Sequence, residues 1–220
     1  MVELAPSILS CNFANLQADI EETYGTELKT LHIDVMDGLF VPNISFGFKV
    51  ISDIREKNDY FFDAHAMIEE PIRYVEEFKK AGVDRLTVHI EACEDLDKTI
   101  DLIKKAGMEV GITSKPATDF KSLLPYLSKV DQVLVMSVEP GFGGQSFMEE
   151  SIEKMKFLRE YIDENKLDCI LEVDGGIKTT NVEKVIDAGV DLIVSGSDVF
   201  GKNIKEQINK YYEIFKQKSL

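Results

Sequence analysis

Residues 61–89, FFDAHAMIEEPIRYVEEFKKAGVDRLTVH, contain one strand–helix–strand unit whose pattern recurs along the chain. The runs Phe61–Met67 and Arg85–His89 are short and bounded by polar or turn residues, as expected of strands. The segment between them has Pro71 in its first turn, two lysines near its end and a closing Gly82, which are start and stop signals of a helix. The stretch therefore predicts a βα unit followed by a second strand.

Eight such strand candidates occur in the 220 residues, which leaves roughly 27 residues for each unit, enough for a strand, a helix and two short loops. We therefore expect an α/β protein with a single (β/α)8 TIM barrel as its one domain, residues 1–220. A doubly wound open sheet is the alternative, but its usual GxGxxG marker is absent after the first strand, where the chain reads SILSCNFANL. The eight candidates are Leu4–Leu9, Leu31–Val35, Phe61–Met67, Arg85–His89, Glu109–Thr113, Gln132–Ser137, Ile170–Val173 and Leu192–Ser195.

The balance of charge restricts the partners of the protein. Lys and Arg number 25 and Asp and Glu number 40, which gives a formal net charge of −15. This charge repels nucleic acid, and no basic stripe offsets it. Exposed charges are screened over about 8 Å at physiological salt. A small phosphate ester therefore remains a possible ligand if its site is built locally.

The cellular setting follows from cysteine use and hydropathy. The three cysteines, Cys11, Cys93 and Cys169, are widely spaced and include no CxxC pair, so neither a disulfide framework nor a thiolate zinc site is expected. No window approaches the roughly 18 apolar residues of a membrane span. The first ten residues contain no Lys or Arg. We expect a soluble cytoplasmic protein with no membrane partner.

Polar residues at three strand ends point to a metal site. In LHIDVMDG, His32 and Asp34 alternate with apolar residues and share one face of the strand. His65 in FFDAHAMI has the same placement, and Asp174 ends the seventh strand in LEVDGGI. Because barrel enzymes gather their chemistry at the carboxyl ends of the strands, these side chains are expected to converge on one divalent cation. His89 is expected to support the site or the core rather than to be a ligand.

The predicted ligand set contains nitrogen and oxygen but no sulfur. Such a set suits Zn, Fe(II), Mn or Co and does not choose among them. A hydrogen-bonded buried pair is the alternative explanation of the His-x-Asp motif alone, but the agreement of three strand ends favours one divalent metal ion per subunit.

Three glycine-rich segments follow the sixth, seventh and eighth strands. They read EPGFGGQSF at 139–147, VDGGI at 173–177 and VSGSDVFG at 194–201. Each is a turn signal by itself, but together they indicate a phosphate site, because glycine lets backbone N–H groups approach an anion. The residues expected to contact the phosphate are Gly141, Phe142, Gly143, Gly144, Gly175, Gly176, Gly196 and Ser197.

Three methionines, Met36, Met67 and Met136, stand at strand ends. A methionine there usually fills the core. We expect these three to line the active site, where their polarizable thioethers would cover a delocalised enediolate and exclude water.

The motifs, in order and spacing, resemble those of the ribulose-phosphate 3-epimerase family over nearly the whole chain. They are PSILSCNFANL (6–16), HIDVMDGLFVPNISFG (32–47), DAHAMIEEP (63–71), VLVMSVEPGFGGQSF (133–147) and VDGGI with SGSDVF (173–200). The resemblance implies 3-epimerisation of D-ribulose 5-phosphate to D-xylulose 5-phosphate in the pentose phosphate pathway, by a homo-oligomeric enzyme acting on a small phosphorylated ketose.

The resemblance also implies the roles of individual residues. His32, Asp34, His65 and Asp174 would ligate the metal, Asp34 and Asp174 would act as the acid–base pair, and Ser7 and His65 would contact the substrate. Removal of the C3 proton beside the C2 ketone gives an enediolate. Inversion requires that a second group return a proton to the opposite face, which explains the need for two aspartates.

The chain departs from the family pattern at Leu39, Ala66 and Ser114, and the first two are expected to lie close enough to the site that the fine substrate preference stays open. An epimerase acting on allulose 6-phosphate remains an alternative that comparative rates on the two sugars would decide. A phosphosugar decarboxylase is disfavoured because IDVMDG lacks the lysine of an Asp-x-Lys-x-x-Asp signature. A non-catalytic phosphosugar-binding barrel is disfavoured because both aspartates and both histidines are present.

Overall fold

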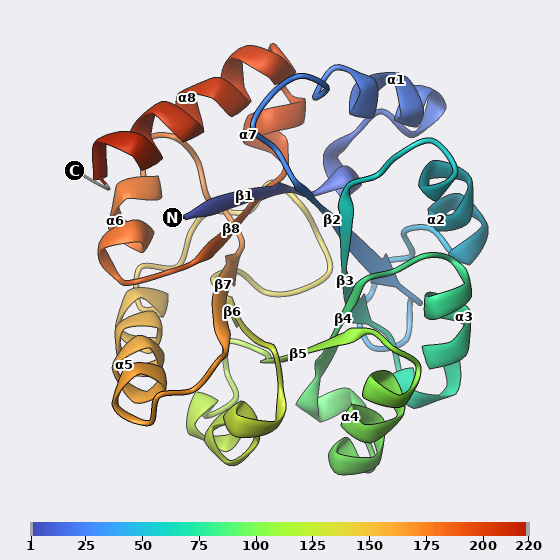
Figure 1. Ribbon diagram of the computed structural model, residues 1–220, viewed down its shortest axis with the longest axis vertical. Coiled ribbons are helices and arrows are strands. Elements are labelled where there is room, and N and C mark those ends of the chain that lie inside the picture. The colour runs from blue at the N-terminus through green and yellow to red at the C-terminus, as the bar shows by residue number, and fades with distance from the viewer. Residues whose placement is uncertain (1, 219–220) are drawn as a thin grey trace.

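The computed structural model describes residues 2–218, and over this range eight parallel strands form one sheet in the order β1-β8-β7-β6-β5-β4-β3-β2. Ser7, directly after β1, forms a parallel bridge with His32 of β2, so the two ends of the sheet meet. Helices surround the strands on the outside (Figure 1). The (β/α)8 barrel predicted from the sequence is confirmed.

The elements alternate along the chain as the sequence predicts. The strands are β1 Glu3–Pro6, β2 Thr30–Met36, β3 Phe61–Met67, β4 Arg85–His89, β5 Glu109–Ser114, β6 Gln132–Met136, β7 Ile170–Asp174 and β8 Leu192–Ser195. The α-helices are α1 Leu16–Glu21, α2 Phe48–Arg55, α3 Val75–Lys80, α4 Leu96–Lys105, α5 Ser151–Glu164, α6 Val182–Asp187, α7 Ser197–Phe200 and α8 Ile204–Lys218.

The first strand is shorter than predicted. The expected Leu4–Leu9 strand begins at Glu3 and ends at Pro6, and Ile8–Ser10 forms a 3-10 helix instead. The cause is local, because the Ser7 hydroxyl accepts a hydrogen bond from the Leu9 N–H and caps this turn. The other seven strands end within one residue of their predicted limits.

The helix predicted from Pro71 is also modified. Pro71–Tyr74 is a 3-10 helix, and the α-helix begins only at Val75. The next predicted helix is regular, because Asp95 accepts a hydrogen bond from the Lys98 N–H, at 3.0 Å, and caps α4. The segment between β5 and β6, Phe120–Lys129, is 3-10 throughout and contains Pro125.

The two faces of the strands differ in chemistry. Outward-facing side chains such as Ile33, Phe62 and Leu171 are buried in one large apolar cluster with the helices. Inward-facing residues include buried polar and charged groups, among them His32, Asp63 and Glu172. The helices therefore rest on an apolar layer, while the barrel interior is largely polar.

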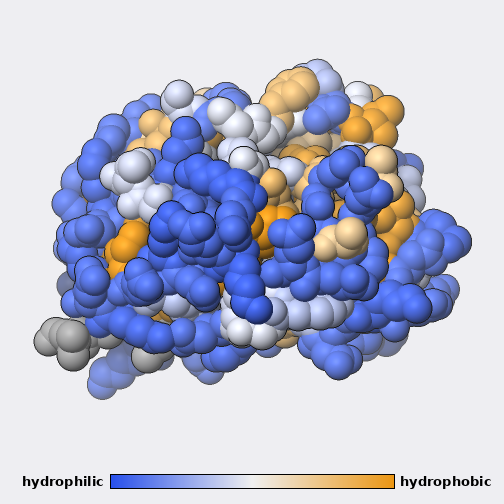
Figure 2. Space-filling view, turned by 90° about the horizontal axis from the view of Figure 1, so that it is seen from above, coloured by the Kyte–Doolittle hydropathy of each residue, from blue (hydrophilic) through white to orange (hydrophobic). Residues whose placement is uncertain are grey.

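The surface agrees with the acidic composition. Figure 2 shows a face that is mostly hydrophilic, with hydrophobic residues in small groups. None of the helices in residues 2–218 has the length and apolar character needed to cross a bilayer.

A close contact between β4 and β5 gives a test of the packing inside the barrel. A Cβ at Gly111 would lie 2.1 Å from Thr87 Oγ1 and 2.9 Å from Thr87 Cβ. We expect Gly111→Ala to lower the free energy of unfolding by about 1–3 kcal/mol, because the extra methyl overpacks the interior. Urea unfolding measures the change.

Thr87→Ala removes Oγ1, the atom in closest contact, and provides the control. The double variant should be less destabilised than the sum of the two single changes. Strict additivity would contradict the packing explanation.

Candidate active site

The register of the strands brings the polar residues of the interior together. Asp34 of β2 lies beside His65 of β3, and Met136 of β6 lies beside Asp174 of β7. All four are at the carboxyl ends of their strands, where β2 and β7 are separated in the barrel by β1 and β8. The two aspartates therefore enter the site from different parts of the barrel wall.

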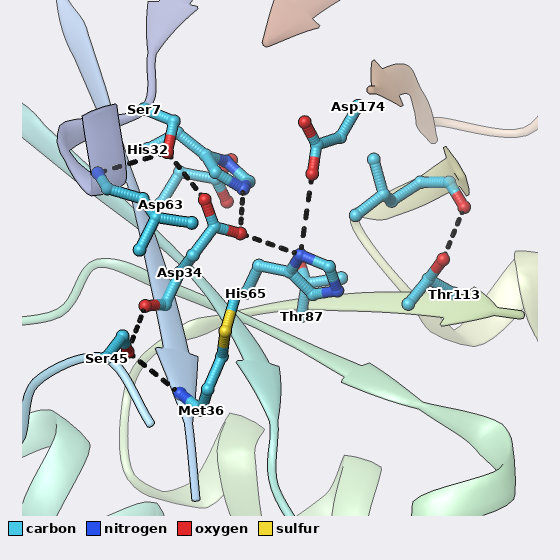
Figure 3. Close-up of polar contacts among 12 residues, drawn as sticks. Ser7, His32, Asp34, Met36, Ser45, Asp63, His65, Thr87, Thr113 and Asp174 are labelled. Atoms are coloured by element: carbon cyan, nitrogen blue, oxygen red, sulfur yellow. Dashed lines mark hydrogen bonds and ion pairs between the residues drawn. The ribbon is translucent and has the colours of Figure 1, made fainter. Parts of the chain in front are cut away.

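Asp34 is the centre of the contacts at this end (Figure 3). Its Oδ2 accepts a hydrogen bond of 2.5 Å from the Ser7 hydroxyl, and its Oδ1 lies 3.2 Å from His65 Nδ1 and 3.5 Å from His32 Nε2. Asp174 reaches the same nitrogen of His65, with Oδ2 at 3.8 Å. Both carboxylates therefore face the same nitrogen, His65 Nδ1.

His32 presents an unpartnered nitrogen to the site. Its Nδ1 lies 3.0 Å from Asp63 Oδ2, whereas its buried Nε2 has no hydrogen-bond partner among the described residues. A carboxylate can only accept, so Nδ1 carries a proton and, in the neutral ring, Nε2 has a free lone pair. His32, Asp34, His65 and Asp174 each offer one ligand atom, and these four atoms lie within 4.8 Å of one another. This buried cluster could hold a metal ion.

A cavity opens above these side chains. Its lining contains Ser7, Asp34 and Asp174, the three methionines Met36, Met67 and Met136, and every glycine-loop residue singled out in the sequence: Gly141, Phe142, Gly143, Gly144, Gly175, Gly176, Gly196 and Ser197. The structure therefore places the expected phosphate loops and the paired aspartates around one space.

Two of these glycines hold backbone where no side chain fits. A Cβ at Gly176, whose φ is +67°, would lie 2.5 Å from the Phe147 backbone nitrogen, and one at Gly196 would lie 2.4 Å from Ser10 Oγ. At Gly176 a larger residue would push two backbone segments apart, whereas at Gly196 it would displace the Ser10 side chain. The loops after β6, β7 and β8 consequently close around the cavity through backbone rather than side chains.

Comparison with protein families shows to which family the chain belongs. The model of the ribulose-phosphate 3 epimerase family matches residues 3–200.

The chain belongs to the ribulose-phosphate 3-epimerase family.

Curated members of the epimerase family match at high coverage. The ribulose-phosphate 3-epimerase of Bacillus subtilis is 43% identical over 208 residues, which cover 94% of this chain and 96% of the relative. The enzyme of the same name from Escherichia coli is 40% identical over 198 residues, covering 90% and 88%. The predicted family and the predicted class of enzyme, a carbohydrate epimerase, are confirmed.

Solved structures with much lower identity support the fold alone. The 3-hexulose-6-phosphate synthase of Salmonella typhimurium has a TM-score of 0.75 at 18% identity, covering 99% of this chain and all of that one. KGPDC from Streptococcus mutans has a TM-score of 0.73 at 15% identity, with coverages of 99% and 98%.

The surroundings of Asp34 and Asp174 shift the pKa values of the two carboxyls in opposite directions. Burial tends to raise the pKa of Asp34, but the nearby His32 imidazole and the hydrogen bond with His65 hold this pKa well below its usual range. Burial and the negative charge of Asp34 raise the pKa of Asp174 to about 6. One carboxyl is therefore firmly ionised and the other is readily protonated near neutral pH.

Neighbouring carboxylates also shift the pKa of His32. Burial tends to lower the pKa of His32, but the charge of Asp34, the hydrogen bond with Asp63 and the nearby carboxylate of Glu172 raise it well above its usual value. These surroundings favour positive charge at His32, whether from a proton or from a cation that replaces the proton.

The sequence did not single out Glu172, a buried polar residue in the barrel interior. Glu172 is fully buried, hydrogen-bonded by Gln132, and lies 3.5 Å from His32 Nδ1. Its alternation with Asp174 in LEVDGGI placed it on the inner face and could have identified it. Ser10, in the turn after β1, also lines the cavity and was not singled out.

The departures from the family pattern lie at different places. Inner and outer residues alternate along β3, so His65 faces the interior and Ala66 belongs to the apolar cluster outside the barrel. An effect of Ala66 on substrate preference stays a prediction. Leu39 is 73% exposed and is not part of the cavity lining. Ser114 lines a separate small cavity with Leu134.

The raised pKa of Asp174 has a consequence for stability. A carboxyl whose pKa is about 6 in the folded state and lower in the unfolded state destabilises the fold as pH rises through this interval. In metal-free protein, Asp174→Asn should raise the free energy of unfolding at pH 8 by about 1–3 kcal/mol. Urea unfolding from pH 8 to pH 5 should show this gain shrinking as pH falls.

Asp53→Asn, on the exposed side of α2, serves as the control and should change stability by no more than about 0.5 kcal/mol at any of these pH values. A pH-independent gain at position 174 would show that the aspartate is not held at a raised pKa.

Proposed function

We propose that this chain interconverts D-ribulose 5-phosphate and D-xylulose 5-phosphate through proton transfer by Asp34 and Asp174. The observation that carries the proposal is the pair of aspartates, Asp34 buried and Asp174 partly exposed, on separate strands and with pKa values shifted in opposite directions. Membership of the ribulose-phosphate 3-epimerase family supports the substrate.

Inversion at C3 needs one group that takes a proton and another that gives one. Asp34, held ionised by its imidazole neighbours, is the base in this scheme, and Asp174, with its pKa at about 6, is the acid. The base removes the C3 proton to form an enediolate, and the acid delivers a proton to the opposite face. The roles are exchanged in the reverse reaction.

The residues present fit a divalent metal. His32 Nε2 has no partner among the described residues, and both carboxylates lie near His65 Nδ1. The ligands would be His32, Asp34, His65 and Asp174. This set contains no thiolate and suits Zn, Fe(II), Mn or Co. When bound, the cation supplies a Lewis acid that stabilises negative charge developing on the substrate.

The other residues of the cavity orient the substrate. Ser7, which donates to Asp34, and His65 are proposed to contact the sugar. Backbone N–H groups of Gly141–Gly144, Gly175–Gly176 and Gly196–Ser197 are proposed to hold the phosphate, which offsets the acidic charge of the chain locally. For phosphate binding, the net charge of the chain then matters less than the dipoles of these backbone N–H groups.

We further propose that residues 1–220 form one domain of a cytoplasmic homo-oligomer. The family resemblance supports the oligomer, and the free cysteines Cys11, Cys93 and Cys169 suit a reducing compartment. Light scattering of the purified protein tests the oligomeric state.

Isotope exchange tests the proposed reaction directly. Metal-analysed protein incubated with D-ribulose 5-phosphate in D2O should form D-xylulose 5-phosphate with deuterium at C3. Asp34→Asn and Asp174→Asn should each lower kcat by at least about 1000-fold, since general acid–base steps contribute 100- to 10000-fold. Asp53→Asn is the matched control and should retain the rate. Either active-site variant with near-normal turnover would refute the two-aspartate mechanism.

The methionines allow a separate test of the cavity lining. Met67→Leu preserves volume but removes the thioether, so the protein should keep its stability and bound metal while kcat falls several-fold. Turnover, metal content and urea unfolding measure the three properties. If turnover is unchanged, Met67 contributes only packing and its thioether has no role in the reaction.

A further inference from the structure

A buried hydroxyl joins the glycine-rich segments that follow β7 and β8. Ser195 ends β8 and directly precedes Gly196, while Ile177 directly follows Gly176. The Ser195 hydroxyl is buried and donates to the Ile177 carbonyl oxygen at 3.0 Å. A hydrogen bond between buried groups fixes the two backbones relative to each other, next to the glycines that line the cavity.

Asp198 joins the same two segments a second time. It lies in α7, directly after Ser197, and its side chain is buried. Its Oδ2 accepts a hydrogen bond from the Thr179 N–H at 3.0 Å, in the segment between β7 and α6. Lys202 donates to the other oxygen, Oδ1. The carboxylate therefore links the turn into α7 with the segment after β7.

Helix α8 supplies two further donors to Asp198. Gln207 Nε2 lies 2.7 Å from Asp198 Oδ2, and the Tyr211 hydroxyl lies 3.0 Å from the same oxygen. Burial tends to raise the pKa of Asp198, but hydrogen bonds from Lys202, from the Thr179 N–H and from these two side chains lower it. The carboxylate is therefore ionised and can only accept. Its Oδ2 holds α7, α8 and the segment after β7 together.

Tyr211 contacts both connections between the segments. Its hydroxyl lies 2.9 Å from Ser195 Oγ and 3.4 Å from the Ile177 carbonyl oxygen, in addition to its contact with Asp198. The phenol is buried, and burial raises its pKa above the usual value, so the hydroxyl keeps its proton. Because Asp198 is ionised, the Tyr211 hydroxyl donates to it, and the phenol oxygen is able to accept from Ser195.

These contacts bear on phosphate binding because backbone donors must point in fixed directions. The segments held in place contain Gly175–Gly176 and Gly196–Ser197, whose N–H groups are proposed to bind the phosphate. Donors that are already oriented bind an anion at a lower entropic cost than mobile donors. The arrangement also has an electrostatic cost, because it places an ionised aspartate directly after a phosphate-binding residue. Lys202 offsets this charge at Oδ1.

We propose that Asp198 and Tyr211 are positioning residues that hold the segments after β7 and β8 in the geometry that binds the phosphate group of the substrate. The inference rests on the proposed function, because that function assigns these segments to phosphate. Neither residue belongs to the cavity lining, so both act through the backbone of residues that do.

Tyr211→Phe is the sharpest test, because it removes one hydroxyl and keeps the ring in the core. We expect KM for D-ribulose 5-phosphate to rise about three- to tenfold while kcat stays within about twofold, since Asp34 and Asp174 are untouched. The inhibition constant of inorganic phosphate should rise by the same factor. Steady-state kinetics measure these constants. Unchanged values of KM and of the inhibition constant would overturn the proposal.

Tyr212→Phe is the matched control. Tyr212 is the next residue of α8 and is also buried, but its hydroxyl interacts with the Leu4 backbone in β1. This variant should lose a similar amount of stability, measured by urea unfolding, without a change in KM or in phosphate inhibition. If Tyr212→Phe raised both constants as much as Tyr211→Phe, a general loosening of the helix would explain the effect and the proposal would be refuted.

Two replacements of Asp198 separate its acceptor oxygen from its volume. Asparagine keeps an oxygen that can accept from Thr179, Gln207 and Tyr211, whereas alanine leaves all three donors unpaired. We expect Asp198→Ala to raise KM more than Tyr211→Phe does, and Asp198→Asn to recover most of this loss. Equal KM values for the two Asp198 variants would contradict the role given to the acceptor oxygen.

The inference and the proposed function fail in different ways. Calorimetry measures binding of inorganic phosphate to the wild type and to the two tyrosine variants without turnover. A wild type that binds phosphate but does not epimerise D-ribulose 5-phosphate would refute the proposed reaction, and the phosphate affinities of the variants would still decide the inference. A wild type that does not bind phosphate would overturn the inference itself.

Discussion

The burial of the Asp34 carboxylate is the constraint on which the rest of the site depends. An ionised carboxylate with only 6% of its side chain exposed requires compensation from its neighbours. Ser7, His32 and His65 provide it, from β2, β3 and the turn after β1. The strands can supply these partners only in the observed register, so the electrostatics of the site and the pairing of the barrel are linked.

The barrel separates structural stability from chemistry by layer. Apolar residues outside the strands pack against the helices, and this cluster holds the fold together. The interior below the site instead contains His32, Asp63, Arg85, Gln132 and Glu172, joined by hydrogen bonds and ion pairs. Such groups cost desolvation energy, and their arrangement fixes ring orientations rather than adding stability.

Differences in local environment give similar side chains different properties. Asp34 and Asp174 both face the same site, yet imidazole neighbours lower the pKa of Asp34, while partial burial and the charge of Asp34 raise the pKa of Asp174. The histidines differ in the same way, since three carboxylates surround His32 while His89 contacts His65 and Glu91. Identity in the sequence therefore does not determine the protonation state.

The sequence by itself determined the order of the elements, the inward face of each strand and the family, because period-two alternation and glycine spacing are local properties of the chain. It also singled out His32, Asp34, His65 and Asp174, whose positions at strand ends could be read without coordinates. Only the tertiary structure showed the contact of Glu172 with His32 and the contact of His89 with His65. These depend on distances between strands, which separation along the chain does not specify.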